Sequence, residues 1–539
     1  MRFFLIAVLL VCLRVNAQQT ISQVWVADNG DGTYKNPVIN ADYSDPDAVR
    51  VGNDYFLTAS SFDAIPGLPI LHSRDLVNWT IIGHALLRQP PYDHFSSTQH
   101  GNGVWAPAIR WHSGRFYIYY PDPDYGIYVT TAQEAAGPWS EPVLVEAGKG
   151  LIDPCPLWDD DGRVYLVHAY AGSRAGIKSI IVVKRLNAEG TKVMDEGKMV
   201  YDGHAADPTI EGPKFYKRHG YYYIFAPAGG VSTGWQVVLR SKQVYGPYER
   251  RVVMDQGGTP VNGPHQGAWV NTPFGEDWFL HFQDKGAYGR VVHLQPMKWV
   301  SDWPLIGIDK DHNGKGEPVL VYKKPKASGV LPVMTPQESD EFDSLQLGPQ
   351  WQWQANPRAT WCLLNPSAGT LSLFSDKIPD SARNLWAVPN LLLQKFPADS
   401  FTVTTKLRFV PNPKLEEEKA GLVIMGMSYG YIAVNSRRGS LHLTYAFCDK
   451  ANMGNAETET ELRTLSGQPA DLYLRVHVMA GAVYRFSYSL DGETFTDAGD
   501  ARKAEPGQWI GAKVGLFCTR SAQTNDSGQA VVDWFRVGK

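Results

Sequence analysis

Tyr43-Ser44-Asp45-Pro46-Asp47-Ala48 runs directly into an apolar and aromatic segment over residues 49–59 and sets a pattern that the chain repeats. Proline cannot donate to a sheet ladder, so Pro46 predicts the entrance of a strand rather than its middle. A residue before proline favours extended backbone, which is the conformation we expect for Asp45. The segment therefore predicts a carboxylate at the mouth of a β-structure.

The same arrangement recurs four more times before residue 325. In each case a proline flanked by small or polar residues opens a strand, and an aromatic strand follows after a turn. The five prolines lie 47 to 61 residues apart. Four strands per repeat at this period predict a five-bladed β-propeller, in which the first strand of each blade lines the central axis. The openings are Asp45-Pro46-Asp47, Trp105-Ala106-Pro107-Ala108, Ile152-Asp153-Pro154-Cys155, Glu211-Gly212-Pro213-Lys214 and Gly263-Pro264-His265-Gln266.

A second unit follows a change of composition at residues 323–329. It begins near Ser339, and its short strands of alternating polarity, such as residues 401–407 and 531–535, fit a β-sandwich. The sequence thus predicts an all-β chain, with a five-bladed β-propeller over residues 36–325 and a β-sandwich over residues 336–539.

Composition narrows the class of partner. The 539 residues are 12% aromatic and only 20% charged, which suits an all-β protein with many turns and a carbohydrate-like partner. A net charge of -4 gives no basic footprint and argues against nucleic acid. The four cysteines after residue 17 lack zinc-site spacing, and a disulfide in the C-terminal third stays open.

Residues 1–17 have the features of a secretory signal. Arg2 precedes a short apolar run, and Val15-Asn16-Ala17 offers compact residues before a cut after Ala17. The run is too short to span a bilayer, so we expect no stable membrane anchor. The expectation is an exported protein, either periplasmic or secreted.

Three acidic side chains belong to the repeated openings. If the openings converge on the axis, Asp45, Asp153 and Glu211 meet there. Glycoside hydrolysis needs two carboxyl groups, one protonated and one ionised, and a third can raise the pKa of the acid or orient it. Arg290 could hold the ionised groups by charge-assisted hydrogen bonds. Taken singly, each of these residues also has a structural explanation, as a turn cap, a strand-end acid or a solvated hairpin residue.

A set of segments in order along residues 36 to about 300 carries a resemblance to a known family. They are Asn36-Pro37-Val38, Asp45-Pro46, Ser60-Ser61-Phe62 to Pro66-Gly67, Leu71-His72-Ser73-Arg74-Asp75-Leu76-Val77-Asn78-Trp79, Trp105-Ala106-Pro107, Ile152-Asp153-Pro154, Glu211-Gly212-Pro213 and Gly289-Arg290. With them the chain resembles glycoside hydrolase family 43, in the branch of β-xylosidases and α-L-arabinofuranosidases. The second unit is more loosely similar to the concanavalin-like, lectin-like domain of that branch.

The resemblance implies a role for each acid. Asp45 would be the general base, Glu211 the general acid, and Asp153 the residue that modulates the pKa of the acid and orients it. The family inverts the anomeric centre, so a water must fit between Asp45 and the sugar. The two carboxyl groups are then expected about 6.5–9.5 Å apart.

The resemblance also suggests residues that bind substrate. Phe62 and Trp105 match positions at which the family packs aromatics against the sugar, although both also fit as core aromatics. His265 matches a central histidine that sometimes lies near calcium. No cofactor is therefore expected to be required, a structural calcium ion at His265 stays open, and a hydrogen-bonded core histidine is the other explanation. Asp47 departs from the small residue usual at that position, which leaves subsite detail open.

The leading hypothesis is an exo-acting glycosidase that releases terminal β-D-xylose or α-L-arabinofuranose from plant cell-wall oligo- or polysaccharides. The sequence does not decide between the two sugars. An insertion at Gln89–Phe95 is expected to wall off the pocket, which favours exo action. A non-catalytic sugar-binding propeller stays open, although all three acids are present. So does a retaining, invertase-like enzyme, although Ile152 stands where those families usually have Arg.

The second unit is expected to buttress the propeller rather than to bind sugar. Its aromatic residues Trp351, Trp353 and Trp361 are more typical of a core than of a ligand platform. A loop from this unit could also close one side of the pocket.

Overall fold

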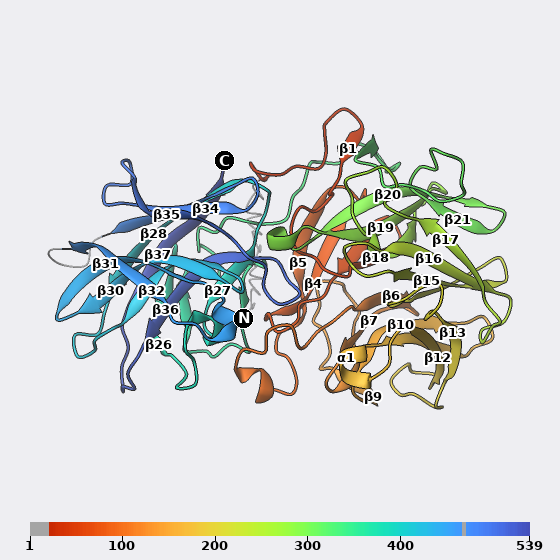
Figure 1. The fold of residues 1–539 in the computed structure, drawn as a ribbon, viewed down its shortest axis with the longest axis horizontal. Helices are drawn as coiled ribbons and strands as arrows, with labels where there is room; N and C mark the ends of the chain where they lie inside the picture. The colour runs from red at the N-terminus through yellow and green to blue at the C-terminus, as the bar shows by residue number, and fades with distance from the viewer. Residues whose placement is uncertain (1–20, 466–470) are drawn as a thin grey trace, which may run out of the picture.

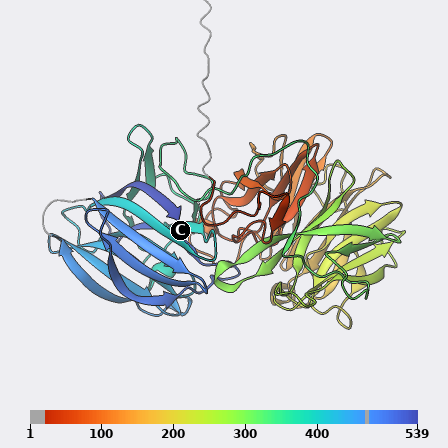
Figure 2. The same ribbon diagram turned by 90° about the horizontal axis from the view of Figure 1, so that it is seen from above.

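The computed structural model describes residues 21–465 and 471–539, and the signal segment expected at residues 1–17 lies outside them. The described chain is almost entirely β and forms two bodies that lie side by side (Figures 1 and 2). In the described residues, helices are few and short, and none is long and apolar enough to cross a membrane. They are α1 (Gly172–Ala175), η1 (His94–Ser96), η2 (Gly286–Tyr288), η3 (Leu385–Ala387) and η4 (Ala451–Met453).

The first body is the five-bladed propeller that the repeat predicted. Each blade is a four-stranded antiparallel sheet whose strands follow one another in chain order. Blade 1 is β2 (Asp47–Val51), β3 (Asp54–Thr58), β4 (Gly67–Ser73) and β5 (Trp79–Leu86), and blade 2 is β6 (Ala108–His112), β7 (Arg115–Asp122), β8 (Gly126–Ala132) and β9 (Val143–Ala147). Blade 3 is β10 (Leu151–Trp158), β11 (Val164–Tyr170), β12 (Ile180–Leu186) and β13 (Lys198–Asp202). Blade 4 is β14 (Lys214–Arg218), β15 (Tyr221–Ala228), β16 (Trp235–Ser241) and β17 (Glu249–Met254), and blade 5 is β18 (His265–Asn271), β19 (Asp277–Asp284), β20 (Arg290–Val300) and β21 (Trp303–Ile306).

The prolines of the openings stand where the pattern placed them, with one exception. Pro46, Pro107, Pro213 and Pro264 each lie immediately before the first strand of a blade. Pro154 instead lies inside β10, where the pairing with β11 shifts register between Ile152 and Cys155. A β-bulge is one of the few places in a sheet that tolerates proline.

The extended backbone expected for Asp45 is wrong. Its φ is +55°, and the residues before Pro154, Pro213 and Pro264 share this left-handed region, with φ of +57° at Asp153, +59° at Gly212 and +46° at Gly263. The clash with a following proline disfavours the right-handed helical region and leaves this turn accessible. Asp tolerates positive φ better than most residues because its short side chain hydrogen-bonds locally. Four of the five blades therefore begin with the same sharp turn.

Residues before blade 1 and after blade 5 close the ring. Strand β1 (Thr33–Lys35) pairs antiparallel with β22 (Val321–Lys323), and Ile39 forms a bridge with Val292 of β20. The buried hydroxyl of Tyr34 donates to the carbonyl of Leu294 at 2.8 Å. The two ends of the propeller are thus tied to blade 5.

The second body is the predicted β-sandwich, with two facing sheets. The first sheet contains β23 (Gln352–Trp353), β26 (Asp376–Lys377), β27 (Leu392–Lys395), β29 (Lys419–Met425), β30 (Tyr429–Arg437), β31 (Ser440–Cys448), β32 (Thr458–Leu465) and β36 (Lys513–Arg520). The second contains β24 (Cys362–Asn365), β25 (Thr370–Phe374), β28 (Phe401–Val410), β33 (Leu472–Met479), β34 (Val483–Ser489), β35 (Thr496–Lys503) and β37 (Gln529–Gly538).

The side chains between these sheets form one core. Trp351, Trp353 and Trp361 belong to it and are at most 5% exposed, which confirms their expected core role. The four described cysteines, Cys155, Cys362, Cys448 and Cys518, are unpaired.

Two lysines, the buried Lys513 and the partly buried Lys395, lie where the sandwich meets the propeller. Lys395 and Lys513 are directly opposite each other on β27 and β36, so their like charges repel. Burial and the charge of Lys395 lower the pKa of Lys513 to about 8, and burial lowers the pKa of Lys395. Among the described residues, no carboxylate lies within ion-pair distance of either ammonium group. The charge of Lys513 therefore costs folding free energy at neutral pH.

Replacing Lys513 should stabilise the protein. In the unfolded chain Lys513 holds its proton up to a pKa near 10.5, so the unfolded state binds more protons between pH 8 and 10.5. The contribution of Lys513 to stability should consequently rise with pH over this interval. Lys513→Met should raise the free energy of unfolding at pH 7 by about 1–3 kcal/mol. Unfolding by heat and denaturant at pH 7 and pH 9.5 measures this, with the exposed Lys149→Met as control; a less stable Lys513→Met at pH 7 would contradict it.

Candidate active site

The residues singled out from the sequence converge on one small cavity at the propeller axis. The cavity has a volume of about 130 Å³, and every blade contributes to its wall. Asp45, Asp153, Glu211, Phe62, Trp105 and Arg290 all line it, as the sequence predicted. The remaining lining residues are Ala106, Ile152, Val231, Gln266 and Trp509.

Asp45 is held as a buried carboxylate by hydroxyl groups and one cation. Ser60 Oγ donates to Asp45 Oδ2 at 2.6 Å, and Ser44 Oγ donates to the same oxygen at 2.8 Å. Arg290 Nη1 lies 3.4 Å from Asp45 Oδ1 and donates to Ser44 Oγ at 2.7 Å. Both side chains are about nine-tenths buried. Hydrogen bonds and a positive charge both favour the ionised form of a carboxyl group.

Asp153 lies in the opposite electrostatic situation. It is 4% exposed, and its Oδ2 accepts one hydrogen bond, from the backbone N–H of Gly212 at 2.7 Å. Burial, followed by the negative charges of Glu211 and Asp45, raises its pKa well above that of an ordinary aspartate. The buried Asp153 carboxyl group therefore holds its proton to higher pH than an ordinary aspartate does.

Glu211 is the more accessible member of this pair. Its side chain is 28% exposed, and His265 Nε2 lies 3.1 Å from its Oε1. His265 is 1% exposed, and its Nδ1 has no hydrogen-bond partner. A bare acceptor nitrogen is less costly to bury than an unpaired N–H, so Nε2 carries the proton and donates it to Glu211. Glu211 also lines the cavity.

The arrangement around His265 also bears on the calcium ion left open by the sequence. Within residues 21–465 and 471–539, no three His, Cys, Asp or Glu side chains gather into a group that could hold a metal ion. His265 is instead a buried, hydrogen-bonded histidine that orients Glu211. Calcium at this position stays an expectation from the resemblance alone.

Two aromatic side chains form one wall. Phe62 has a φ of +52° and exchanges backbone hydrogen bonds with Val104 at 2.9 and 3.1 Å. Its ring meets that of Trp105 edge to face, with centroids 6.5 Å apart. Trp105 Nε1 donates to the Gly101 carbonyl at 2.8 Å, which fixes the plane of the indole. Both rings are therefore held in place and line the cavity, with Phe62 only 3% exposed.

Trp509 is the one lining residue that comes from the sandwich. It lies in the connection between β35 and β36, has a φ of +65° and is 49% exposed. Its ring centroid is 6.4 Å from that of Trp105, with the planes at 65°. A loop of the second unit thus reaches the cavity, although nothing in the local sequence indicated which loop.

The insertion at Gln89–Phe95 does not line the cavity. Its backbone is bound by Asn356 of the sandwich, whose Nδ2 donates to the Gln89 carbonyl at 2.9 Å and whose N–H donates to the Phe95 carbonyl at 2.7 Å. The expectation that this segment walls off the pocket is wrong, because its polar backbone groups are satisfied at the domain interface.

Asp47, the departure from the family pattern, lies below the cavity. It is fully buried, and its Oδ2 accepts from the N–H of Ile109 at 2.8 Å and from Arg110 Nη1 at 2.6 Å. Arg110 Nη2 in turn contacts Cys155 Sγ at 2.8 Å. These contacts join the first strands of three blades, so Asp47 braces the axis and does not line the subsite.

Other residues of the site escaped the sequence reasoning. Ser44 and Ser60 lie in quoted segments, and Gln266 follows His265, but nothing in the pattern indicated their direction. The backbone of Gln266 is in the left-handed region, with a φ of +38°. A Cβ on Gly212 would lie 2.7 Å from the Gln266 side chain. Glycine at 212 is therefore needed for the close approach of the two openings.

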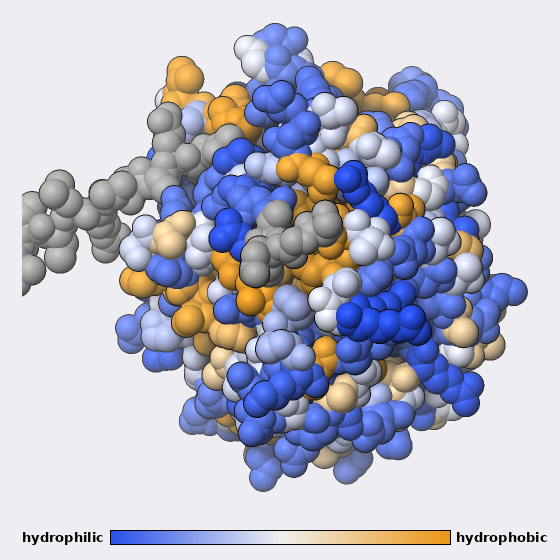
Figure 3. Space-filling model, turned by 90° about the vertical axis from the view of Figure 1, so that its left-hand side faces the viewer, coloured by the Kyte–Doolittle hydropathy of each residue, from blue (hydrophilic) through white to orange (hydrophobic). Residues whose placement is uncertain are grey.

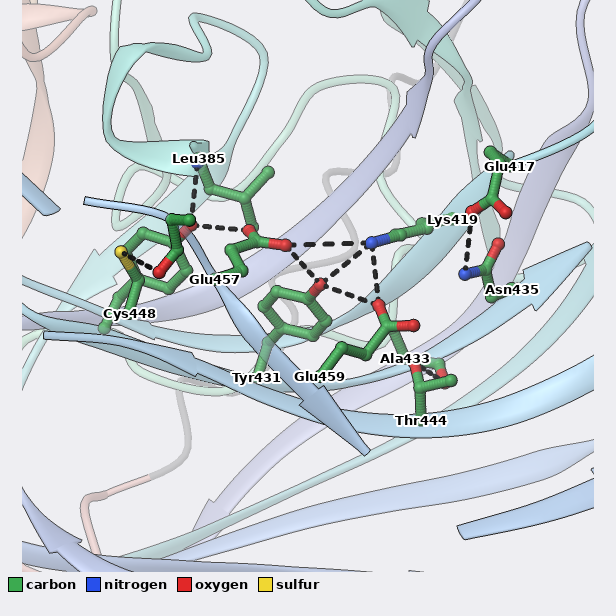
Figure 4. Close-up of polar contacts among 12 residues, drawn as sticks. Leu385, Glu417, Lys419, Tyr431, Ala433, Asn435, Thr444, Cys448, Glu457 and Glu459 are labelled. Carbon is green, nitrogen blue, oxygen red and sulfur yellow. Dashed lines mark hydrogen bonds and ion pairs between the residues drawn. The ribbon is translucent and has the colours of Figure 1, made fainter. Parts of the chain in front are cut away.

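The outer face of the sandwich offers no comparable site. There the buried Tyr431 hydroxyl lies between Glu457, Glu459 and Lys419, at 2.9, 3.3 and 3.1 Å (Figure 4). Lys419 Nζ also binds Glu459 at 2.8 Å, so these charges satisfy one another. The end of the sandwich is mostly hydrophilic, with smaller apolar patches (Figure 3). Self-paired charges favour the buttress role over sugar binding.

Comparison with known proteins agrees with this geometry. The sequence profile of Glycosyl hydrolases family 43 matches residues 34–304, and that of the Beta xylosidase C-terminal Concanavalin A-like domain matches residues 339–538. A relative from Xylanibacter ruminicola is 40% identical over 495 residues, which is 91% of this chain and 87% of the relative. A β-xylosidase from Formosa agariphila is 34% identical over 556 residues, covering 94% of this chain and 90% of its own.

Solved structures show the same two-domain fold. The crystal structure of a xylan β-1,4-xylosidase from Bacillus halodurans is 26% identical and superposes with a TM-score of 0.82 over 94% of this chain and all of its own. The matched profiles and the relatives show that this chain is a glycosidase and belongs to glycoside hydrolase family 43.

Proposed function

We propose that this protein is an inverting exo-glycosidase that releases terminal pentoses, β-D-xylose or α-L-arabinofuranose, from plant cell-wall oligo- and polysaccharides. The observation that carries the proposal is the contrast between the carboxyl groups in one cavity. Two hydroxyl groups donate to Asp45 and Arg290 lies beside it, whereas burial and the charges of Glu211 and Asp45 raise the pKa of Asp153. One base and one acid are what inverting hydrolysis requires.

In the proposed reaction a water attacks the anomeric carbon from the side of Asp45. Asp45 takes a proton from that water as the new C–O bond forms, and Glu211 gives its proton to the leaving oxygen as the glycosidic C–O bond breaks. The single displacement inverts the anomeric centre. His265 holds one oxygen of Glu211, so the proton on the other is directed at the leaving group.

The size and closure of the cavity support exo action. Phe62 and Trp105 give a terminal sugar ring an apolar surface, and Trp509 closes the cavity from the sandwich. Relatives named as a β-xylosidase and as a non-reducing end α-L-arabinofuranosidase, the latter from Bacteroides ovatus at 31% identity, support a terminal pentose. We further propose export, on the sequence of residues 1–17, because a polymeric plant substrate lies outside the cell.

The first prediction concerns the acid. The protein should hydrolyse nitrophenyl β-D-xylopyranoside or α-L-arabinofuranoside and a natural disaccharide such as xylobiose. Glu211→Ala should lower kcat/KM on the disaccharide by about 10²–10⁴-fold but much less on the nitrophenyl glycoside, because an activated leaving group needs little protonation. The exposed Glu249→Ala is the control. An equal loss on both substrates would contradict the acid role, and NMR detection of a first product with retained configuration would overturn inversion.

The second prediction concerns pH. Asp153→Asn keeps an oxygen to accept the Gly212 N–H but removes the buried acid whose pKa is raised beside Glu211. The alkaline limb of kcat/KM should therefore move to lower pH by about 1 unit or more, while the acid limb, set by Asp45, stays in place. The pH profile on xylobiose measures both limbs. An alkaline limb at the wild-type position would show that Asp153 does not tune the acid.

The third prediction concerns Trp509. Trp509→Ala should raise KM for a disaccharide about 10-fold, with a smaller change in kcat, because it removes aromatic surface from one side of the bound sugar. Trp534→Ala, on the same domain but outside the cavity, is the matched control. Unchanged KM in Trp509→Ala would exclude a role of this wall in binding.

A further inference from the structure

A single buried carboxylate joins the propeller to the sandwich beside the active-site cavity. Asp42 is 3% exposed. Its Oδ1 accepts the backbone N–H of Arg290 at 2.8 Å, and its Oδ2 accepts the backbone N–H of Gly511 at 3.0 Å. Arg290 begins β20 of blade 5, whereas Gly511 lies in the sandwich connection between β35 and β36. Each oxygen of one side chain thus holds a different domain.

Both partners lead directly to the cavity. The side chain of Arg290 reaches Asp45 and Ser44, and Gly511 follows Trp509 by two residues. Asp42 therefore holds the backbone of the group that flanks the base and the backbone of the group that forms the sandwich wall. Among the described residues that line the cavity, Trp509 alone belongs to the sandwich.

The approach of the two domains at this point is unusually close. A Cβ on Gly511 would lie 2.7 Å from the N atom of Gly289, and a Cβ on Gly289 would lie 2.5 Å from the side chain of Asp42. The N–H of Ala512 donates to the carbonyl of Ala287 at 2.7 Å. Backbone lies on backbone, so the connection cannot shift without losing the bonds to Asp42.

Two lysine side chains interact electrostatically with Asp42. The negative charge of Asp42 raises the pKa of Lys395 and of Lys513 against the larger effect of burial, and no ion pair joins either lysine to a carboxylate among the described residues. The other titratable groups of this junction are Tyr43, Asp63, His84 and His100. A buried carboxylate that accepts two N–H groups beside two cations makes strong charge-assisted hydrogen bonds.

We propose that Asp42 is a positioning residue that fixes the Trp509 loop against blade 5, so that the sandwich completes the sugar-binding wall of the cavity. The inference rests on the proposed function and deepens it. Asp42 touches no substrate; it acts through Gly511 on Trp509. The substrate contact that it controls is the outer face of the terminal pentose.

Hydrogen exchange tests the structural half of the inference without any substrate. Asp42→Asn has the same shape but presents an NH₂ group to one of the two backbone N–H groups, so that bond is lost and two donors face each other. Exchange of the peptide containing residues 505–513 should accelerate at least 10-fold, whereas the core strands of both domains stay protected. Glu418→Gln is the matched control, because Glu418 is also buried and accepts two backbone N–H groups, from Asn412 and Gly528, inside the sandwich. Wild-type exchange of residues 505–513 in Asp42→Asn would overturn the inference.

A double-mutant cycle tests the functional half. Asp42→Asn should act mainly on KM for xylobiose or the corresponding arabinoside. The fold-increase in KM should be about ten times the fold-decrease in kcat. In a Trp509→Ala background the same substitution should have at most a third of that effect on KM, because the contact that it positions is already gone. Equal effects in both backgrounds would overturn the inference. A different result would separate the two proposals. If residues 505–513 exchange faster in Asp42→Asn but the wild-type protein hydrolyses neither pentoside, the positioning role of Asp42 stands and the proposed function is refuted.

Discussion

Like charges repel strongly where water is scarce, and Asp45, Asp153 and Glu211 share one small cavity. The structure resolves this repulsion unequally. Two hydroxyls and Arg290 surround Asp45, whereas Asp153 receives one backbone N–H and the charges of its neighbours. The pKa of Asp153 is consequently the one that is raised. The separation into base and acid is thus a consequence of different surroundings and not of residue type.

The propeller brings these carboxyl groups together because each blade contributes one short segment at the axis. Asp45, Asp153, Gly212 and Gly263 all have positive φ immediately before proline, so four openings turn in the same way. Strained backbone of this kind persists only where the surrounding structure determines it, and here the first strands are braced by Asp47, Arg110 and Cys155. The bracing joins the first strands of blades 1, 2 and 3, and the positive-φ turns at Asp45 and Asp153 belong to blades 1 and 3.

The sequence carried enough information for the blades but not for the closure of the cavity. Alternation and the spacing of Pro46, Pro107, Pro154, Pro213 and Pro264 record local pairing, which is why the propeller, the sandwich and the convergence of the acids were predictable. Trp509 has no such record: it lies in an irregular connection, and its place depends on how two domains dock. The prediction for the Gln89–Phe95 insertion failed for the same reason, since its partner Asn356 is 267 residues away from Gln89 in the chain. The prediction of extended backbone at Asp45 failed because a following proline disfavours the right-handed helical region without choosing between the other allowed regions.

The sandwich is then more than a support, although its outer face carries self-paired charges. Its docking places one aromatic ring in the cavity. The same interface contains Lys395 and Lys513, which face each other and whose like charges repel. Such a pair would be eliminated if stability alone mattered, because apolar side chains of similar volume pack without a desolvation penalty. The pair lies beside Asp42, whose carboxyl group accepts the backbone N–H groups of Arg290 and Gly511. One arrangement therefore contains the two facing lysines, the bridging Asp42 and the exposed Trp509. It lowers the stability of the interface, and it closes the cavity on the side that the propeller leaves open.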